Sequence, residues 1–426
     1  MQRAAQGVRS ASRAAGAALQ GSRQVATDAA GSPAPAVPSP HSLAVQTSGL
    51  ARGPGGRHSI SGLRVCVFGS TGFLGRYVVN ALAQSGSLLS LPTRCVDNKR
   101  QHLKVMGDLG QVVFWDGPHD LIRNDDAMRC VQHTPTPETL APSLPDPHLP
   151  PAAPTRKAIG NCNVVVNLLG RDYETGRYSF EDVHTEAAAR VARLSAEAGV
   201  VRLVHFSALG AAHDSPSKRL RAKAAGEDAV RAVFPTATFV RPAPVFGQED
   251  RLLGTWAGLS KTMPVGVPLI DGGATRMAPV EARDVAAAVK AILDREESAG
   301  RTYTLGGPTV FTVRQLVDLV FHTIRDQPRT VSLPAALAKL LLAKPREVLQ
   351  SLVPFPVPVL PAAMYTADGI DAFGVDYVPP PGALGLADLG IVPRKLEGLN
   401  VDYLRSYRAG GYDLGHTAGR EEGTTA

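Results

Sequence analysis

The sequence predicts an α/β fold in which a doubly wound, parallel sheet carries a smaller, α-rich lobe toward the C-terminus. Two observations predict this class. Short apolar segments alternate with stretches of helical periodicity, as they do in successive βαβ units. A glycine-rich turn follows the first apolar segment and opens a helix, which is the usual start of a doubly wound sheet.

The first 57 residues are predicted to precede the fold as a targeting presequence. They hold six arginines, no lysine and one acidic residue, Asp28, and they lack the apolar core of a secretory signal. A merely disordered tail is the alternative. These residues carry +5 of the net charge of +7, which leaves the remainder near +2. A basic nucleic-acid-binding surface is therefore not expected, and no nucleic acid is predicted as a partner.

Five strands are predicted from apolar, β-branched segments. The first, residues 63–68 (LRVCVF), resembles a strand buried on both faces of a parallel sheet. The others are residues 88–91, 112–115, 164–169 and 202–206. The clearest helix lies between the last two strands, with apolar residues spaced by three or four positions from Val183 to Ala198 and an end at Gly199.

Proline marks two departures from this alternation. Residues 134–157 are rich in proline and poor in large apolar residues, so they are predicted to loop out of a domain that spans residues 58–330. Residues 331–426 are predicted to form a separate C-terminal lobe. In it, residues 333–344 combine leucines with two lysines, as an interfacial helix does, although a helix packed on a partner protein fits equally well.

The four cysteines are predicted to be reduced and mostly buried. Cys66, Cys95, Cys130 and Cys162 lie about thirty positions apart, which matches neither a metal-binding pair nor a disulfide framework. No metal site is predicted. No uninterrupted apolar run is long enough for a membrane-spanning helix, so any membrane contact is expected to be peripheral.

The glycine-rich turn predicts a phosphate-binding site. Residues 69–75 read GSTGFLG, and glycines at these positions make the turn, admit a pyrophosphate and allow close helix packing. A purely structural turn is the alternative. The predicted cofactor-binding residues of this segment are Gly69, Ser70, Thr71, Gly72, Phe73, Leu74 and Gly75.

The residue that ends the second strand favours NADP(H) over NAD(H). A carboxylate there would hold a free ribose hydroxyl, whereas Arg94 can pair with a 2′-phosphate, with Lys99 and Arg100 nearby. The alternative is that Arg94 is a solvated loop charge and Asp97 holds the ribose. Asp116, after the third strand, is predicted to contact the adenine or else to be a simple turn residue.

Six segments carry a family resemblance. They are FGSTGFLGRYVV (68–79), MGDLGQVVF (106–114), VVVNLLGRDYE (164–174), RLRAKAAGE (219–227), VRPAPVFGQEDRLL (240–253) and LEGLNVDYLRSYR (396–408). They resemble atypical, extended short-chain dehydrogenases/reductases with a Rossmann fold. More specifically, they resemble the family of alpha-subcomplex subunits nine of mitochondrial NADH:ubiquinone oxidoreductase, complex I. The insertion at 134–157 departs from that family's pattern.

The resemblance implies a site and a location. Ser207 and Lys223 would lie on the nicotinamide side, Leu168, Leu169 and Gly170 beside the cofactor, and Pro242 and Phe246 in the segment that closes over the nicotinamide ribose. It also implies the mitochondrion, which composition alone does not separate from the plastid. The expected position is the matrix side of the inner membrane near the quinone-entry region, with other complex I subunits as partners and peripheral membrane contact.

One catalytic residue of these dehydrogenases is missing. Hydride transfer needs a proton-donating tyrosine one helical turn before the lysine, and Arg219 stands four residues before Lys223. Arginine does not release a proton at neutral pH. Ser207 and Lys223 could then be ordinary surface residues, and His184 or His205 could supply another acid, although such histidines are more often structural.

We therefore expect a non-catalytic accessory subunit that binds NADPH structurally and supports assembly. Two alternatives stay open. One is an active NADP-dependent reductase, epimerase or isomerase acting on a lipid-like or sugar-nucleotide substrate. The other is a protein that senses the NADP(H) redox state.

Overall fold

The computed structural model describes residues 47–48, 50–53, 56, 58–93, 97–116, 153–174, 178–263, 266–344 and 363–408. Most of the predicted presequence and most of the predicted insertion lie outside this part of the chain. Within it, Arg52 forms an antiparallel bridge with Ile60, so the end of the predicted presequence contacts the fold. Residues 153–157 were expected to loop outward, but they form the start of a helix because Thr155 and Ala158 are buried against the sheet.

A seven-stranded parallel sheet forms the centre of the described chain, with the strand order β11-β6-β5-β4-β1-β2-β3. All five predicted strands are confirmed. The strands are β1 (Arg64–Phe68), β2 (Leu88–Thr93), β3 (Val112–Asp116), β4 (Val164–Asn167), β5 (Arg202–Phe206), β6 (Thr238–Pro242) and β11 (Thr302–Leu305). Strands β2 and β3 lie on one side of β1, whereas the later strands, beginning with β4, lie on its other side. Doubly wound folds bind ligands at this change in strand order, between β1 and β4.

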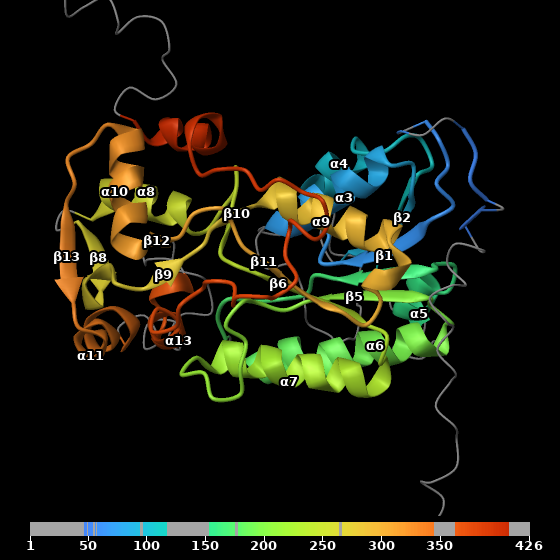
Figure 1. Ribbon diagram of the computed structural model, residues 1–426, viewed down its shortest axis with the longest axis horizontal. Coiled ribbons are helices and arrows are strands. Elements are labelled where there is room, and N and C mark those ends of the chain that lie inside the picture. The colour runs from blue at the N-terminus through green and yellow to red at the C-terminus, as the bar shows by residue number, and fades with distance from the viewer. Residues whose placement is uncertain are drawn as a thin grey trace, which may run out of the picture. The chain divides into compact units, whose positions relative to one another are not determined.

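Helices cover both faces of this sheet (Figure 1). One face carries α3 (Phe73–Gln84), α4 (Asp97–Lys104) and α9 (Ala282–Asp294). The other carries α5 (Ala153–Ile159), α6 (Ala187–Glu197) and α7 (Lys218–Val233). The predicted helix at 183–198 is α6 preceded by one π-helical turn, η2 (Asp182–Glu186). Each face has its own apolar cluster, because side chains alternate between the faces along every strand.

A smaller lobe combines short helices with short strand pairs. Its pairs are β7 (Val245–Phe246) with β10 (Val280–Glu281), β8 (Val267–Ile270) with β13 (Thr330–Leu333), and β9 (Arg276–Met277) with β12 (Phe311–Thr312). Its helices are α8 (Leu253–Thr262), η3 (Asp271–Gly273), α10 (Val313–Ile324), α11 (Ala335–Ala338), η5 (Lys339–Ala343), η6 (Ala363–Tyr365), α13 (Ala367–Ala372) and η7 (Gly398–Tyr407). The short helix η4 (Glu296–Ser298) follows α9 and contacts Arg202 of β5 in the large sheet. The predicted domain boundary after residue 330 falls inside β13, whose partner strand lies at 267–270.

The last described segment returns to the first part of the fold. The backbone N–H of Thr304 in β11 donates a hydrogen bond to the carbonyl of Leu384 over 2.8 Å. Arg394 lies against the start of α9, where its guanidinium is 3.3 Å from the buried carboxylate of Glu281 and its backbone N–H is 2.7 Å from that of Asp284. The C-terminal residues therefore tie the two lobes together.

Two further predictions concern the described part of the chain. None of its helices is long and apolar enough to cross a membrane. Cys66 is a buried free thiol and Cys162 a half-buried one, as expected, whereas Cys95 and Cys130 lie outside the described residues.

Candidate functional site

The glycine-rich turn is built around two close backbone approaches. Gly69 follows β1 with a φ of +79°, which favours glycine, and a Cβ atom there would lie 2.8 Å from the carbonyl oxygen of Leu168. A Cβ atom on Gly75 would lie 2.3 Å from the carbonyl oxygen of Gly69. The first turn of α3 can therefore pack directly on the backbone of the loop, which brings its N-terminus to the end of β1.

The N-terminus of α3 faces this turn without a side-chain cap. Gly72 occupies the capping position and has no side chain to accept from the first N–H groups, and Phe73 and Leu74 begin the helix. The N-terminal end of a helix carries a partial positive charge, and uncapped N–H groups there are donors for an anion. Thr71 lies between Ser70 and Gly72 in the same loop. The geometry is that of a phosphate-binding turn.

Two buried serine hydroxyls at this edge of the sheet have no hydrogen-bond partner within the described residues. Within the described residues, neither the Oγ atom of Ser70 nor that of Ser207 has a hydrogen-bond partner, although both side chains are buried. Ser70 follows β1 and Ser207 follows β5, so both stand at the carboxyl ends of the parallel strands. An unsatisfied buried hydroxyl costs about 1–3 kcal/mol, so these two groups are candidates for satisfaction by a ligand.

The segment after β4 lies beside the turn, as expected. The backbone N–H of Leu168 donates to the carbonyl of Phe68 over 3.0 Å, and that of Leu169 donates to the Oδ1 atom of Asn167 over 3.1 Å. Gly170 then passes the ring of His184, whose Cε1 atom would be 3.4 Å from an added Cβ. These three residues therefore share the sheet edge with the glycine turn.

Lys223 is fixed on the Ser207 side of the same edge. Its Nζ atom donates to the backbone carbonyl of Ser207 over 2.9 Å. Burial, assisted by the positive charge of Arg219, lowers the pKa of Lys223 to about 8. Lys223 and Ser207 are thus in contact, through the serine backbone and not through its hydroxyl.

Arg219, one helical turn before Lys223, is itself paired. Its guanidinium donates to Asp172 over 3.2 Å, and the other oxygen of Asp172 accepts from Arg251 over 2.8 Å. The two arginines lower the pKa of Asp172 against the opposing effect of burial. Tyr377 also lies near this charge, but its hydroxyl donates to the carbonyl of Ala372 over 3.1 Å, and burial raises its pKa. It is not poised to release a proton.

The two histidines considered as alternative acids are both held neutral. Burial lowers the pKa of His184 and of His205 to about 3, and the charge of Lys223 contributes to both shifts. The Nε2 atom of His184 lies 3.0 Å from the carbonyl of Arg171, and the Nδ1 atom of His205 lies 3.2 Å from the side-chain amide of Asn167. At neutral pH neither ring carries the imidazolium proton that a general acid would deliver.

Pro242 and Phe246, two further predicted site residues, lie in β6 and β7. Pro242 ends β6, and its carbonyl accepts from the backbone N–H of Leu209 over 2.9 Å. Phe246 is buried in β7, where it pairs with Glu281 of β10. The polypeptide therefore turns back toward α3 directly after Phe246.

Residues 247–252, which we call the strap, cross from β7 to α8 over the start of α3. A Cβ atom on Gly247 would lie 3.2 Å from both Phe73 and Tyr77, and Glu249 forms an ion pair with Arg76. Asp250 caps α8, accepting from the N–H groups of Leu253 and Gly254 and from the hydroxyl of Tyr403 over 3.0 Å. The sequence analysis included these residues in the segment 240–253 but could not predict the contacts of the strap, because they join residues far apart in the chain.

The adenine side is only partly described. Arg94 lies outside the described residues, as do the side chains of Asp97, Lys99 and Asp116, although Asp116 ends β3 opposite Thr93. Arg100 donates to the Oγ1 atom of Thr93 over 3.3 Å, and its guanidinium lies 5.2 Å from the ring centre of Phe114. Burial lowers the pKa of His102 in α4, the charge of Arg76 lowers it further, and that of Glu249 opposes the shift.

Similar sequences were found among characterised proteins. The chain is 42% identical over 380 residues to "NADH dehydrogenase (ubiquinone) 1 alpha subcomplex subunit 9, mitochondrial" of Arabidopsis thaliana, covering 88% of this chain and 86% of that protein. It is 35% identical to the protein of the same name from Mus musculus, over 84% of each chain. It is also 35% identical to the "NADH-ubiquinone oxidoreductase 40 kDa subunit, mitochondrial" of Neurospora crassa, over 85% of this chain and 84% of that one.

Solved structures resemble the fold at low sequence identity. The PbgP3 protein from Burkholderia pseudomallei matches with a TM-score of 0.53 and 14% identity, over 80% of this chain and 94% of that one. An NADPH-dependent quinone oxidoreductase from Escherichia coli matches with a TM-score of 0.51 and 16% identity, over 80% and 98%. No protein-family model matches the chain. At this identity the structural likeness establishes the fold alone.

Proposed function

This chain belongs to the family of NADH dehydrogenase (ubiquinone) 1 alpha subcomplex subunit 9, and on that premise we propose that it is an accessory subunit of mitochondrial respiratory complex I that holds NADPH without turning it over. Its position would be the matrix side of the inner membrane, near the quinone-entry region. The other subunits of the complex would be its partners.

The observation that carries nucleotide binding is the pair of unsatisfied hydroxyls beside an uncapped helix. Ser70 and Ser207 are buried at the carboxyl ends of β1 and β5, and α3 directs its first N–H groups to the same place. A dinucleotide supplies acceptors for both kinds of donor: its pyrophosphate for the helix N-terminus and its ribose oxygens for the hydroxyls. The residues present therefore fit the group.

The two ends of the nucleotide would be held by different residues. NADPH, when bound, supplies a transferable hydride at its nicotinamide ring. Ser207, Lys223 and Pro242 line that side, with the ammonium of Lys223 fixed by the Ser207 carbonyl. On the adenine side, Arg94 remains the proposed partner of the 2′-phosphate, and the guanidinium of Arg100 near the end of β2 supports it. Binding only to the native state would stabilise the fold by mass action.

Catalytic silence follows from the groups around Lys223. Arg219 donates to Asp172 and has no proton to deliver at neutral pH, and the phenol of Tyr377 is directed at a backbone carbonyl. His184 and His205 are neutral and already engaged. A bound nucleotide would therefore be oriented, while none of these four side chains would complete a proton relay with Lys223.

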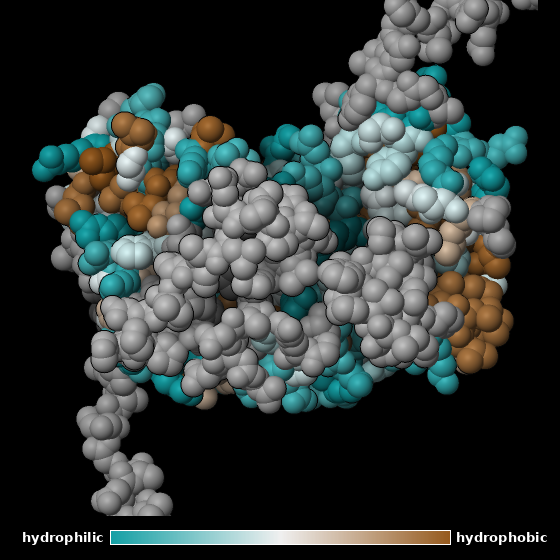
Figure 2. All heavy atoms as spheres, turned by 180° about the vertical axis from the view of Figure 1, so that it is seen from behind, coloured by the Kyte–Doolittle hydropathy of each residue, from teal (hydrophilic) through white to brown (hydrophobic). Residues whose placement is uncertain are grey.

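The leucine-rich turn of the smaller lobe is the proposed docking surface. Leu337, Leu340 and Leu341 of α11 and η5 are 41%, 54% and 53% exposed. A brown area at the right-hand edge of Figure 2 lies over this part of the fold. Lys339, in the same turn, forms an ion pair with Asp371, and Lys344 follows. Exposed leucines beside lysines suit either the lipid headgroup region or an apolar face of a neighbouring subunit.

Three measurements test the proposed function. On a native gel, the endogenous protein should co-migrate with the very large NADH dehydrogenase assembly, and a small free species would refute membership of that complex.

The purified chain should contain NADPH and should not oxidise it against a panel of carbonyl substrates. Multiple turnovers would contradict the proposed lack of catalysis. Arg94→Glu should lose the nucleotide, whereas Arg52→Glu, an exposed arginine in a different part of the chain, should keep it.

A further inference from the structure

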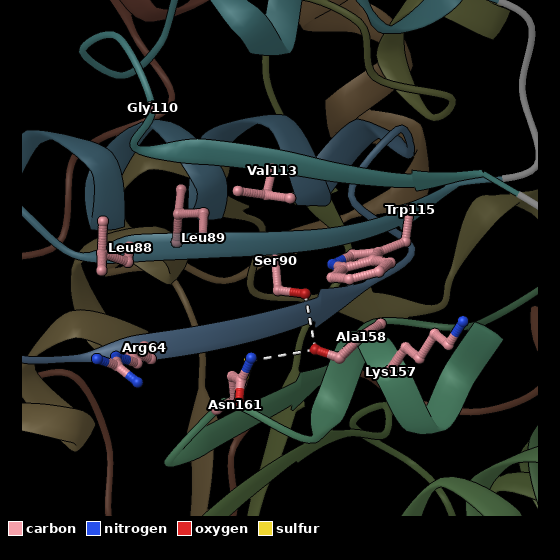
Figure 3. Close-up of a pocket in the computed structure, with 11 residues that line it drawn as sticks. Arg64, Leu88, Leu89, Ser90, Gly110, Val113, Trp115, Lys157, Ala158 and Asn161 are labelled. Carbon is pink, nitrogen blue, oxygen red and sulfur yellow. Dashed lines mark hydrogen bonds between the residues drawn. The ribbon is translucent and has the colours of Figure 1, made fainter. Parts of the chain in front are cut away.

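A pocket separate from the proposed nucleotide site lies on the sheet face that carries α5. It is a pocket of about 240 Å³, and none of the nucleotide-site residues lines it. Apolar side chains of β2 and β3 form much of its wall, with Arg64 and Leu88 at one end and Trp115 and Lys157 at the other (Figure 3). A small solute can therefore reach the groups on its floor.

One of those groups is a thiol. Cys162 lines the pocket, and its Sγ atom donates to the backbone carbonyl of Ala158 over 3.3 Å. The hydroxyl of Ser90 donates to the same carbonyl over 2.7 Å, as Figure 3 shows. Ser90 and Cys162 thus converge on one acceptor at the end of α5.

A second thiol stands directly behind the first. Cys66 of β1 is opposite Ser90 of β2 in the strand register, so both side chains point to the face that carries α5. Cys66 is completely buried, and it packs in the same apolar cluster as Cys162. The pocket therefore leads to a half-exposed thiol, and a buried thiol lies next to it.

The two thiols differ in acidity. A hydrogen bond from Cys66 lowers the pKa of Cys162 against the opposing effect of burial, and the charge of Arg64 contributes. Burial raises the pKa of Cys66 well above its usual value. The thiolate is the nucleophilic form of cysteine, so the accessible thiol of the pair is also the more reactive one.

We propose that Cys162 is a peroxide-sensitive thiol and that Cys66 captures its oxidised form as a disulfide. In the first step the Cys162 thiolate attacks one oxygen of hydrogen peroxide, the O–O bond breaks, and the released hydroxide takes a proton to become water. Cys162 becomes a sulfenic acid, and the peroxide gains the two electrons that the sulfur loses.

In the second step Cys66 attacks the sulfur of the sulfenic acid. The S–S bond forms, the S–O bond breaks, and the hydroxyl leaves as water with the proton of the Cys66 thiol. The sulfur atoms must close to about 2.0 Å. Cys162 lies in the short connection between α5 and β4, outside both elements.

Peptide mapping of the full chain tests the proposal. The reduced protein is treated with hydrogen peroxide, free thiols are blocked with N-ethylmaleimide, and the digest is analysed before and after dithiothreitol. We expect a peptide pair linked through Cys66 and Cys162 that accumulates with peroxide and disappears on reduction. Peroxide-treated protein that lacks this pair, with both thiols still alkylated, overturns the proposal.

Two variants establish the order of the steps. In Cys66→Ser, dimedone, which labels sulfenic acids, should label Cys162 after peroxide treatment. In Cys162→Ser, Cys66 should remain a free thiol, and a dimedone adduct on Cys66 would contradict its role as the second thiol. If either variant fails to fold, dibromobimane provides the test on the wild-type chain, because it bridges two neighbouring thiols and fluoresces when both have reacted. A 66–162 bridge supports the pairing, and separate single adducts refute it.

Discussion

The guanidinium of Arg219 donates a hydrogen bond to the carboxylate of Asp172 over 3.2 Å, one helical turn before Lys223 in α7. A positive charge is therefore held close to Lys223, at the position where the sequence predicts that a catalytic tyrosine is missing. That charge is the second largest cause, after burial, of the lowered pKa of Lys223.

Removing this charge should raise the pKa of Lys223. Arg219→Gln deletes a like charge, so we expect the pKa to rise from about 8 by about one unit. Reductive methylation with ¹³C-formaldehyde and NMR titration of the dimethyl-lysine signal measures it. Arg221→Gln is the matched control on the same helix, because Arg221 donates instead to the carbonyl of Ser215. An equal shift in both variants would disprove the assignment.

An alanine at Gly75 should damage both the fold and nucleotide retention. The added Cβ would lie 2.3 Å from the carbonyl oxygen of Gly69, so α3 must move away from the turn. We expect a loss of about 1–3 kcal/mol in the free energy of unfolding, measured in urea, and loss of NADPH from the purified protein.

Gly258→Ala provides the control for that substitution. Its Cβ would meet only Tyr407, at 3.9 Å, in the middle of α8. Replacing a helical glycine at an open position should be neutral or stabilising by about 0.5–1 kcal/mol. Equal losses in the two variants would remove the special role of the turn.

The buried histidines should make the protein acid-sensitive. The pKa of His184 and of His205 is about 3 in the folded state, against about 6.5 in the unfolded chain. Between these values the unfolded state binds more protons, so stability falls as the pH drops from 6.5 toward 3. The slope is up to about 1.4 kcal/mol per pH unit for each histidine.

Urea unfolding at pH values from about 4 to about 7 measures this dependence. The lower value lies inside the window of about 3 to 6.5 in which the folded and unfolded states bind different numbers of protons, and the upper value lies just above it. His184→Gln and His205→Gln should each flatten the curve, whatever their effect on stability at pH 7. His322→Gln, at an exposed position of α10, should leave the slope unchanged. A wild-type slope in both buried variants would show that these rings do not titrate as described.

Loosening the strap should speed nucleotide release. Tyr403→Phe removes the hydroxyl that donates to Asp250. Asp250 belongs to the strap and caps α8. The loss of about 1 kcal/mol for one hydrogen bond corresponds to roughly fivefold faster release of NADPH. Stopped-flow displacement by excess NADP⁺, followed through NADPH fluorescence, reports the rate. Tyr407→Phe, also in η7, should release NADPH at the wild-type rate.

Charge placed on the leucine-rich turn should block assembly without unfolding the chain. The double variant Leu340→Asp, Leu341→Asp puts two carboxylates where exposed leucines stand. We expect an unchanged thermal transition and a loss of the variant from the large assembly on a native gel. Val392→Asp, at an isolated residue that is 87% exposed, should assemble normally. Normal assembly of the double variant would exclude this turn as the docking surface.

The sequence predicted those parts of the fold that depend on local patterns. Strand β4 is buried along its whole length, and its three consecutive valines identify it without knowledge of its neighbours. The glycine turn was recognisable for the same reason. Residues 153–157 were misjudged because α5 contains Pro154, and only its packing on β2 shows that the helix is part of the fold.

Long-range contacts could not be predicted from local patterns. The pairing of β13 with β8, the return of Arg394 to Glu281 and the contact of Tyr403 with Asp250 each join residues separated by more than fifty positions. Likewise, the missing tyrosine before Lys223 was visible in the sequence, but the carboxylate that pairs with Arg219 was not. The proposed 2′-phosphate contact of Arg94 stays a prediction.

Because the C-terminal residues return to the first lobe, some contacts of that lobe can form only late in translation. A ribosome releases the glycine turn early, but Arg394 and Tyr403 emerge only when almost the whole chain has been made. A premature stop codon before residue 384 would spare every strand of the large sheet, yet it would remove the arginine that joins Glu281 to Asp284 and the tyrosine that anchors the strap. Late truncations should therefore yield a chain that folds in part and is removed by quality control, although the nucleotide-binding turn itself is intact.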